Sequence, residues 1–213
     1  MRAPEEKTKE AGAPAQGVLA GIFVGGESRR MGRAKGLFMA PGAGGHNLVE
    51  RLHSELTRVA KQTPCVLVGA RPEYAHLPFA TIEDAQEKSG PLGGLVSLLM
   101  EAEKRGAKSV LVLACDFPYL SGELMGRLLG MPLEEVSCAH LDGRFQPLFA
   151  RYSLAVLPRF SQALHEGRLA LQPLLRESQV ALLTLSEEEK LLLRDWDTPE
   201  DVGLEPRFGS VPH

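Results

Sequence analysis

The stretch FVGGESRRMGRAKGLF near the start of the chain combines residue types that could hold phosphate. Gly25 and Gly26 carry no side chain, so backbone N–H groups there could approach an anion closely. Ser28 could donate a hydroxyl hydrogen bond, and Arg30 and Lys35 could bring positive charge to more than one phosphate. These residues fit a di- or triphosphate. An ordinary strand–helix turn with a solvated basic face explains the same composition.

Two acidic stretches contain candidate ligands for a divalent cation. In ACDFPYL, Asp116 follows the most apolar stretch of the chain, Ser109–Cys115, and a strand that ends in one carboxylate can present it to Mg²⁺. In RDWDTPEDV, Asp195 and Asp197 are separated by one residue, so an extended chain would project both side chains to one face. Either could be the second carboxylate that binds Mg²⁺. Capping of nearby helices is the alternative for Asp116 and Asp197.

Three further positions could contact a nucleotide. Asp84 follows a predicted strand, and a carboxylate that accepts hydrogen bonds from two adjacent ring N–H groups would recognise guanine; alternatively, it only fixes its loop. Gly90 and Gly94, in GPLGGL, could let the backbone approach a base or a phosphate, or could serve close packing of a helix on a sheet. For Gln146, in FQPLFARY, we favour a structural role at an edge backbone over contact with a substrate.

Composition excludes several classes of protein. The 213 residues are 44% hydrophobic and 24% charged, which suits one globular domain. A net charge of −3 gives no overall basic field for nucleic acid. Three cysteines without C-x-x-C spacing indicate neither a disulfide framework nor a zinc site, but small buried side chains in a reducing cytoplasm. No apolar run approaches the roughly 18 residues of a membrane helix.

Short apolar stretches alternate with segments of helical periodicity. Strands are predicted over 18–24, 65–69, 79–83, 109–115, 136–140, 146–152 and 179–185, the fifth and sixth around an LDGR turn. Helices are predicted over 47–60, from about Leu92, from Ser121, over roughly 153–166 and 170–177, and from Thr198. Strands that are apolar throughout are covered on both faces, which predicts a three-layer α/β/α fold with a mostly parallel sheet. The candidate residues follow strand ends, where such folds bind ligands.

The composition also divides the chain. Residues 1–16, rich in Ala, Pro, Glu and Lys and without an apolar signal core, are expected to be a disordered lead-in. Residues 17–204 are expected to form a single domain, and residues 205–213 a loose C-terminal tail.

Five motifs, in order along the chain, resemble those of the MobA-like nucleotidyltransferase family. GGESRRMGRAK resembles its G-G-x-S-x-R-M-G-x-x-K signature, GPLGGL its G-P-L-x-G loop, and ACDFPYL its C-D-x-P-[FY]-[LI] metal motif. QPLFARY resembles its [HEQ]-P-L-x-A-x-Y strand, and DWDTPEDV its N-x-N-T-P-E-D-[LI] ending. The resemblance covers residues 17–203 and implies a Rossmann-like nucleotidyltransferase fold.

The resemblance also implies an activity, namely that of a cytoplasmic, Mg²⁺-dependent molybdenum cofactor guanylyltransferase. Its substrates would be GTP and the molybdenum–molybdopterin cofactor, and its by-product would be pyrophosphate. Proteins that handle the cofactor would be its transient partners. The residues that match the family's nucleotide site are Gly25, Gly26, Ser28, Arg30, Gly32, Lys35, Asp84, Gly90 and Gly94. Among them Arg30 and Lys35, together with Asp116, would be catalytic, and Asp116 and Asp197 would bind the metal.

The chain departs from the family pattern in three places. F-V-G-G replaces L-A-G-G, Ala34 stands where an acidic residue often precedes the lysine, and the ending is D-x-D instead of N-x-N. The D-x-D form is similar to that of cytidylyl-transferring relatives, so the choice between GTP and CTP stays open. A cytidylyl- or sugar-1-phosphate nucleotidyltransferase is therefore the alternative. A non-catalytic nucleotide-binding partner would need a damaged metal site, whereas Lys35 and Asp116 are both present.

Overall fold

The computed structural model describes residues 17–25, 34–42, 44–84, 86 and 88–196. Within them, the chain forms a seven-stranded sheet in the order β3-β2-β1-β4-β6-β5-β7. The strands are β1 Val18–Phe23, β2 Cys65–Val68, β3 Ala80–Ile82, β4 Ser109–Ala114, β5 Val136–Leu141, β6 Arg144–Ser153 and β7 Val180–Leu183. All neighbouring strands pair in parallel except that β6 is antiparallel to β4 and β5. The predicted mostly parallel sheet is confirmed.

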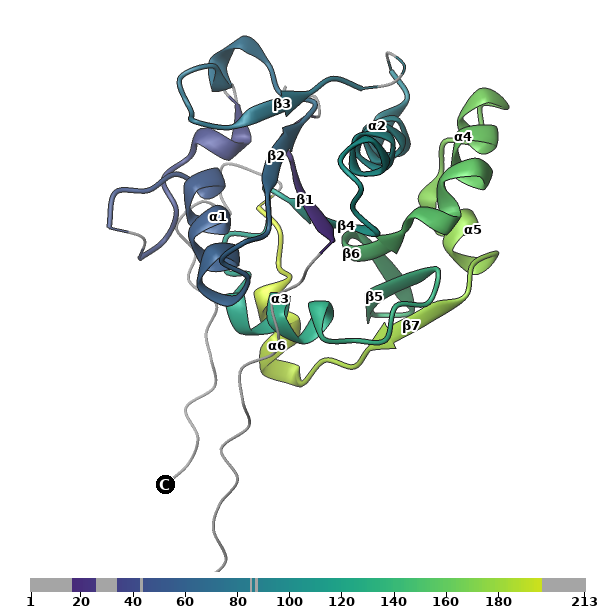
Figure 1. Cartoon of the computed structure of the whole chain (residues 1–213). Coiled ribbons are helices and arrows are strands. Elements are labelled where there is room, and N and C mark those ends of the chain that lie inside the picture. Colours follow the sequence, from purple (N-terminus) through teal and green to yellow (C-terminus); the bar gives the residue numbers. More distant parts are fainter. Residues whose placement is uncertain (1–16, 26–33, 43, 85, 87, 197–213) are drawn as a thin grey trace, which may run out of the picture.

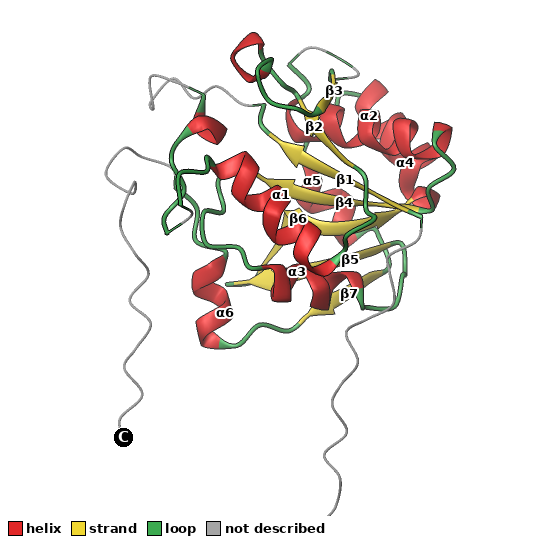
Figure 2. Cartoon of the chain, turned by 60° about the vertical axis from the view of Figure 1, so that its left-hand side comes forward, coloured by secondary structure: helices red, strands yellow, loops and turns green. Residues whose placement is uncertain are grey.

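Helices cover both faces of this sheet. They are α1 Leu48–Val59, α2 Gly90–Lys104, α3 Gly122–Leu129, α4 Leu157–His165, α5 Leu171–Arg176 and α6 Glu187–Leu192, with 3₁₀ turns η1 Lys35–Leu37, η2 Pro72–Tyr74 and η3 Leu154–Val156. In Figures 1 and 2, α1 and α3 lie on one face, and α2, α4 and α5 on the other. The described residues therefore form the expected three layers, and none of their helices is long and apolar enough to cross a membrane.

Alternation along the central strands separates two hydrophobic cores. In β1, Ala20 and Ile22 join the core beneath α1 and α3, whereas Leu19 and Phe23 join the core beneath α2 and α4. Every residue of β1 is buried, because successive side chains of a strand point to opposite faces and both faces are covered.

Local capping explains where several helices begin. Asn47 caps α1 in a capping box with Glu50, as the sequence predicts, and the Ser121 side chain accepts a hydrogen bond at the start of α3. The structure adds α6, for which the sequence analysis made no prediction. Its capping box, Ser186 with Glu189, is the local signal that could have revealed it.

The second helix begins earlier than the sequence indicated. We expected a start near Leu92, but α2 begins at Gly90, so the GPLGGL stretch is mostly helical. Pro91 occupies the first turn, where its missing N–H costs no hydrogen bond. Gly90 has a φ of +58°, which a glycine adopts without strain.

The β5–β6 hairpin places the beginning of β6 beyond the end of β4. Asp142 and Gly143 have φ angles of 50° and 76°, which fits the tight turn predicted at LDGR. Leu113, one residue before β4 ends, pairs with Phe149, well inside β6. Because β6 is antiparallel to β4, its first residues from Arg144 lie at the edge where the parallel strands end.

Candidate active site

The candidate site lies where the order of the strands reverses within the sheet, between β1 and β4. From β1 the chain proceeds to β2 and β3 on one side, and it returns to β4 on the other side of β1. Ligands of open α/β sheets bind outside the carboxyl ends of the strands at such a point. Gly25 follows β1 and Asp116 follows β4, so both stand at this position.

Gly25 allows the ends of β1 and β2 to pack closely at this position. Its N–H donates a 3.3 Å hydrogen bond to the carbonyl of Val68, so that amide already has a partner within the fold. A Cβ added to Gly25 would lie 3.3 Å from the Gly69 Cα. The ends of β1 and β2 therefore come together because neither residue has a side chain, and Gly69 has the positive φ, +70°, that favours glycine.

Lys35 and Asp116 meet at the ends of these strands. Lys35 opens η1, and its Nζ lies 3.4 Å from Oδ2 of Asp116, at hydrogen-bond and ion-pair distance. The two side chains are 15% and 28% exposed, so the pair is reachable from solvent and is only partly screened by it. The structure brings together an ammonium group that can bind phosphate and a carboxylate that can bind a divalent cation.

A buried tyrosine holds the backbone next to Lys35. The N–H of Gly36 donates a 3.1 Å hydrogen bond to the hydroxyl of Tyr74, in η2, and Tyr74 is 1% exposed. A Cβ on Gly36 would lie 2.8 Å from Cγ2 of Val49, so the turn packs without a gap. Burial raises the pKa of Tyr74, which keeps the hydroxyl neutral. Sequence reasoning missed Tyr74 because no local pattern links it to a residue 38 positions away.

Trp196 ties the C-terminal end of the described chain to Asp116. Its N–H donates a 3.1 Å hydrogen bond to the carbonyl of Asp116, and its ring is 2% exposed. The ring packs edge-on to Tyr119, with centroids 6.2 Å apart, and within a small cluster that includes Phe38. Asp195 is consequently carried to the neighbourhood of Asp116, with its side chain exposed. The spacing of the aspartates is visible in the sequence, but no local pattern revealed that Trp196 holds Asp195 near Asp116.

The three cysteines are packing residues, as the sequence predicts. All are free thiols, Cys115 and Cys138 buried and Cys65 partly so. Burial raises the pKa of Cys65 and of Cys138 to about 12, and burial beside Asp116 raises the pKa of Cys115 further. Cys115 adjoins the site and stays a thiol, which is a poor nucleophile.

Asp84 and the first turns of α2 share the same edge of the sheet. A Cβ added to Gly94 would lie 2.8 Å from Cγ1 of Val68, 2.9 Å from Cε1 of Phe23 and 3.1 Å from Oδ1 of Asp84. Desolvation by these surroundings raises the pKa of Asp84. Gly94 therefore serves close helix–sheet packing, one of the two roles considered for it, and the carboxylate lies against it. Around Gly90, an added Cβ would meet open space.

Several predicted site residues lie outside the described residues. They are Gly26, Ser28, Arg30, Gly32 and Asp197. Their roles, and that of Thr198 as the start of a helix, stay predictions. In the part of the chain that the structure describes, no group of three or more His, Cys, Asp or Glu side chains could hold a metal ion.

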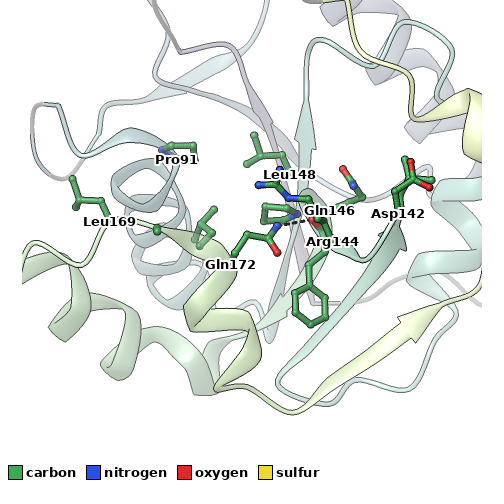
Figure 3. Close-up of a pocket in the computed structure, with 12 residues that line it drawn as sticks. Pro91, Asp142, Arg144, Gln146, Leu148, Leu169 and Gln172 are labelled. Carbon is green, nitrogen blue, oxygen red and sulfur yellow. Dashed lines mark hydrogen bonds between the residues drawn. The ribbon is translucent and has the colours of Figure 1, made fainter.

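Gln146 lines a cavity beside this site. Its strand, β6, pairs with β4 only over Phe149–Ser153, so Gln146 lies in the part of β6 that extends beyond β4, and its structural role at an edge backbone stays a prediction. The cavity has a volume of about 550 Å³ and lies between the first turn of α2, the β5–β6 hairpin and the beginning of α5 (Figure 3). No sequence pattern indicated the cavity, because its walls come from three separate segments.

Comparison with known proteins agrees with this architecture. A family model described as a MobA-like NTP transferase domain matches residues 20–182. A molybdenum cofactor guanylyltransferase of Pseudomonas putida is 33% identical, covering 80% of this chain and 88% of that protein. One of Xanthomonas euvesicatoria is 30% identical, covering 84% and 89%.

A solved structure supports the fold independently. The crystal structure of molybdopterin-guanine dinucleotide biosynthesis protein A from Archaeoglobus fulgidus superposes with a TM-score of 0.67 at 21% sequence identity. The superposition covers 85% of this chain and 93% of that chain. Because the family model spans most of the chain, this chain belongs to the MobA-like NTP transferase family.

Proposed function

We propose that this protein transfers GMP from GTP to the molybdenum–molybdopterin cofactor and releases pyrophosphate. One observation carries the proposal: Lys35 and Asp116 lie 3.4 Å apart at the ends of β1 and β4, the position where an open α/β sheet binds its ligand. The choice of substrates is supported by the relatives from Pseudomonas putida and Xanthomonas euvesicatoria, which are named molybdenum cofactor guanylyltransferases.

The reaction is a substitution at phosphorus. An oxygen of the terminal phosphate of molybdopterin forms a bond to the α-phosphorus of GTP, and the bond from that phosphorus to the bridging oxygen breaks. Pyrophosphate leaves with the bonding electrons. The attacking oxygen is already anionic, so no general base is required, and positioning and neutralisation of charge supply the catalysis. Lys35 and Arg30 are the cations assigned to the phosphates.

The residues at the site fit a catalytic magnesium ion. Such an ion commonly takes one or two carboxylates together with phosphate oxygens and water, so a full cage of protein ligands is not needed. Asp116 would hold it, with Asp197 as the proposed second ligand. Bound Mg²⁺ would neutralise charge on the phosphate oxygens of the nucleotide. Asp116 itself is fixed by the hydrogen bond from the Trp196 amide to its carbonyl.

Recognition of the base is assigned to Asp84. A carboxylate there would accept hydrogen bonds from two N–H groups on one edge of guanine, an edge that cytosine does not share. The N-terminal turns of α2, with Gly90 and Gly94, would pass close to the nucleotide. A cytoplasmic location is part of the proposal, because the three thiols are free. Transient contact with proteins that handle the cofactor is a further expectation.

Mass spectrometry of the product tests the proposal. The full chain is incubated with Mg²⁺, an equimolar mixture of GTP and CTP, and the molybdenum cofactor. A guanine dinucleotide product with release of pyrophosphate is expected. A cytosine product would overturn the assignment of the base and favour the cytidylyl alternative. Nucleotide binding without turnover, independent of Mg²⁺, would instead indicate a non-catalytic partner.

A further inference from the structure

Two side chains of α1 bind the backbone of the segment that connects Asp116 to α3. Nη1 of Arg51 donates a 2.9 Å hydrogen bond to the carbonyl of Leu120. One helical turn later, Oε2 of Glu55 accepts a 2.6 Å hydrogen bond from the N–H of Gly122, the first residue of α3. Residues four apart lie on the same side of a helix, so one side of α1 holds this segment at two successive points.

The helices α1 and α3 pack closely around these two hydrogen bonds. A Cβ added to Gly122 would lie 2.7 Å from the carbonyl oxygen of Glu55, and Leu120 is fully buried. Figure 2 shows α1 beside α3 on one face of the sheet. Arg51 is half-buried, and its charge makes the hydrogen bond to a carbonyl stronger than a neutral one. The segment is therefore docked on α1 by directed bonds within a close-packed contact.

The beginning of the same helix holds the turn that carries Lys35. The N–H of the first residue of α1 donates a 3.0 Å hydrogen bond to the carbonyl of Phe38, at the end of η1. Val49, in the first turn of α1, packs against Gly36, whose added Cβ would lie 2.8 Å from it. Helix α1 thus contacts both chain segments on which the pair of Lys35 and Asp116 stands.

Asp116 lies between a fixed strand end and the two bonds from α1. Before it, the N–H of Cys115 donates a 3.1 Å hydrogen bond to the carbonyl of Phe23 in β1. After it, the next hydrogen bond from α1 comes at Leu120, four residues along the chain. A carboxylate binds a metal ion well only if its orientation is held by its surroundings. Loss of the bond from Arg51 would release one end of the short segment that sets this orientation.

We propose that Arg51, assisted by Glu55, is a positioning residue that fixes the Asp116 carboxylate for the divalent cation. Arg51 acts through the backbone of residues 117–120 and not through contact with the nucleotide. The inference rests on the proposed function, in which Asp116 binds the metal. It makes α1 the common support of the ammonium group and the carboxylate at the site.

Binding of Mn²⁺ in the presence of GTP, followed by electron paramagnetic resonance on full-length variants, tests this role. Arg51→Met removes the guanidinium and keeps an apolar stem, whereas Arg51→Lys keeps a donor. Arg105→Met is the matched control, because Arg105 pairs with Glu101 at the far end of α2. Residues that orient a metal ligand commonly contribute 10–100-fold in metal affinity, so Arg51→Met should raise the dissociation constant for Mn²⁺ about tenfold. Arg51→Lys should recover most of this loss, and the control should match the wild type.

A second measurement distinguishes positioning from a general loss of structure. The affinity for GTP without divalent cation should be the same for wild type and Arg51→Met. If Arg51→Met does not fold, as judged by circular dichroism, Glu55→Gln decides. Its neutral amide accepts the bond from Gly122 more weakly, so Mn²⁺ binding should weaken by a smaller factor. Unchanged Mn²⁺ binding by the folded variant, a loss shared by Arg105→Met, or an equal loss of metal-free GTP affinity would overturn the proposal.

Asp116→Asn separates this inference from the proposed function. If the wild type makes no guanine product, the proposed function fails, and Arg51 is then judged by Mn²⁺ binding alone. Loss of Mn²⁺ binding in Asp116→Asn, with the tenfold weakening in Arg51→Met, supports the positioning role whichever product is formed. Mn²⁺ binding that Asp116→Asn leaves unchanged would overturn the assignment of the ligand and the role of Arg51 with it.

Discussion

At the scale of single residues, the ion pair of Lys35 and Asp116 joins two groups with separate tasks. In the proposed reaction the carboxylate binds the metal, and the ammonium group binds the phosphates. In the structure the two lie 3.4 Å apart, so each lowers the electrostatic cost of leaving the other partly buried. The same contact contributes little to stability, because partly exposed ion pairs are commonly worth about 0–1 kcal/mol.

Lys35→Ala should therefore separate catalysis from folding. Removing one group that stabilises transition-state charge should lower kcat by about 10²–10³-fold. The free energy of unfolding should change by no more than about 1 kcal/mol. Pyrophosphate release and denaturant unfolding measure the two effects, and Lys104→Ala, on the exposed side of α2, is the matched control. Near-normal pyrophosphate release from the Lys35 variant would contradict the catalytic role.

Asp84 gives a prediction for pH. Desolvation raises its pKa above the 3.8 of an ordinary aspartate, so the carboxylate becomes protonated at a higher pH than usual. Only the ionised form accepts two hydrogen bonds from guanine, so the affinity for GTP should fall as the pH drops through this raised pKa. Isothermal titration calorimetry with GTP, repeated from neutral pH downwards, measures this affinity. Asp84→Asn should bind GTP more weakly and lose this pH dependence. A variant with the same profile as the wild type would exclude Asp84 from base recognition.

At the scale of elements, α2 controls how closely the helical layer approaches the strand ends. Gly94 lies in its second turn, against Val68, Phe23 and Asp84. The helix can rest on the ends of β1 and β2 because this position has no side chain. One glycine thus couples the packing of a layer to the placement of the carboxylate assigned to guanine.

Gly94→Ala tests this coupling. The added Cβ would lie 2.8 Å from a methyl group of Val68, so α2 or the strand must shift, at a cost of about 1–3 kcal/mol of stability. The shift should displace Asp84 and raise the KM for GTP. Gly126→Ala in α3 is the control, since its Cβ would meet Val59 at an ordinary 3.7 Å and alanine favours a helix by up to about 1 kcal/mol. Equal stability of the two variants would contradict the packing argument.

At the scale of the whole molecule, the site joins segments from most of the chain length. Strand ends near residues 25 and 115, two 3₁₀ turns and the segment at Trp196 all meet there. Trp196 is the single tryptophan of the sequence, and it is buried beside Asp116. Its fluorescence therefore reports on the site and on global unfolding together.

Ligand binding should stabilise the whole fold. At a GTP concentration about 100 times its dissociation constant, linkage gives about 2.7 kcal/mol, because GTP binds only the folded chain. For a domain of this size, that raises the melting temperature by roughly 5–10 °C. Trp196 fluorescence during heating measures the change, with CTP in place of GTP as the control. An equal shift with CTP would contradict selectivity for guanine, and removal of Mg²⁺ should reduce the shift.

Much of this architecture could be predicted because its determinants are local. Apolar strands such as that ending at Asp116, the Asn47 cap and the LDGR turn each depend on residues within a few positions of one another. The α2 start was placed late, because glycines next to a proline indicate a turn until packing on a sheet stabilises their helical conformation. Tyr74 and Trp196 gave no local signal, since their partners Gly36 and Asp116 are 38 and 80 positions away.

The sequence by itself determined the α/β class, the parallel core of the sheet and the family, because periodicity and motif order are properties of neighbouring residues. Only the tertiary structure decided that Lys35 lies beside Asp116, that Gly94 packs against Asp84 and that Gln146 faces a cavity. These contacts depend on strand order and on the direction of β6. Both follow from the balance of packing across the two cores, which no short stretch of sequence contains.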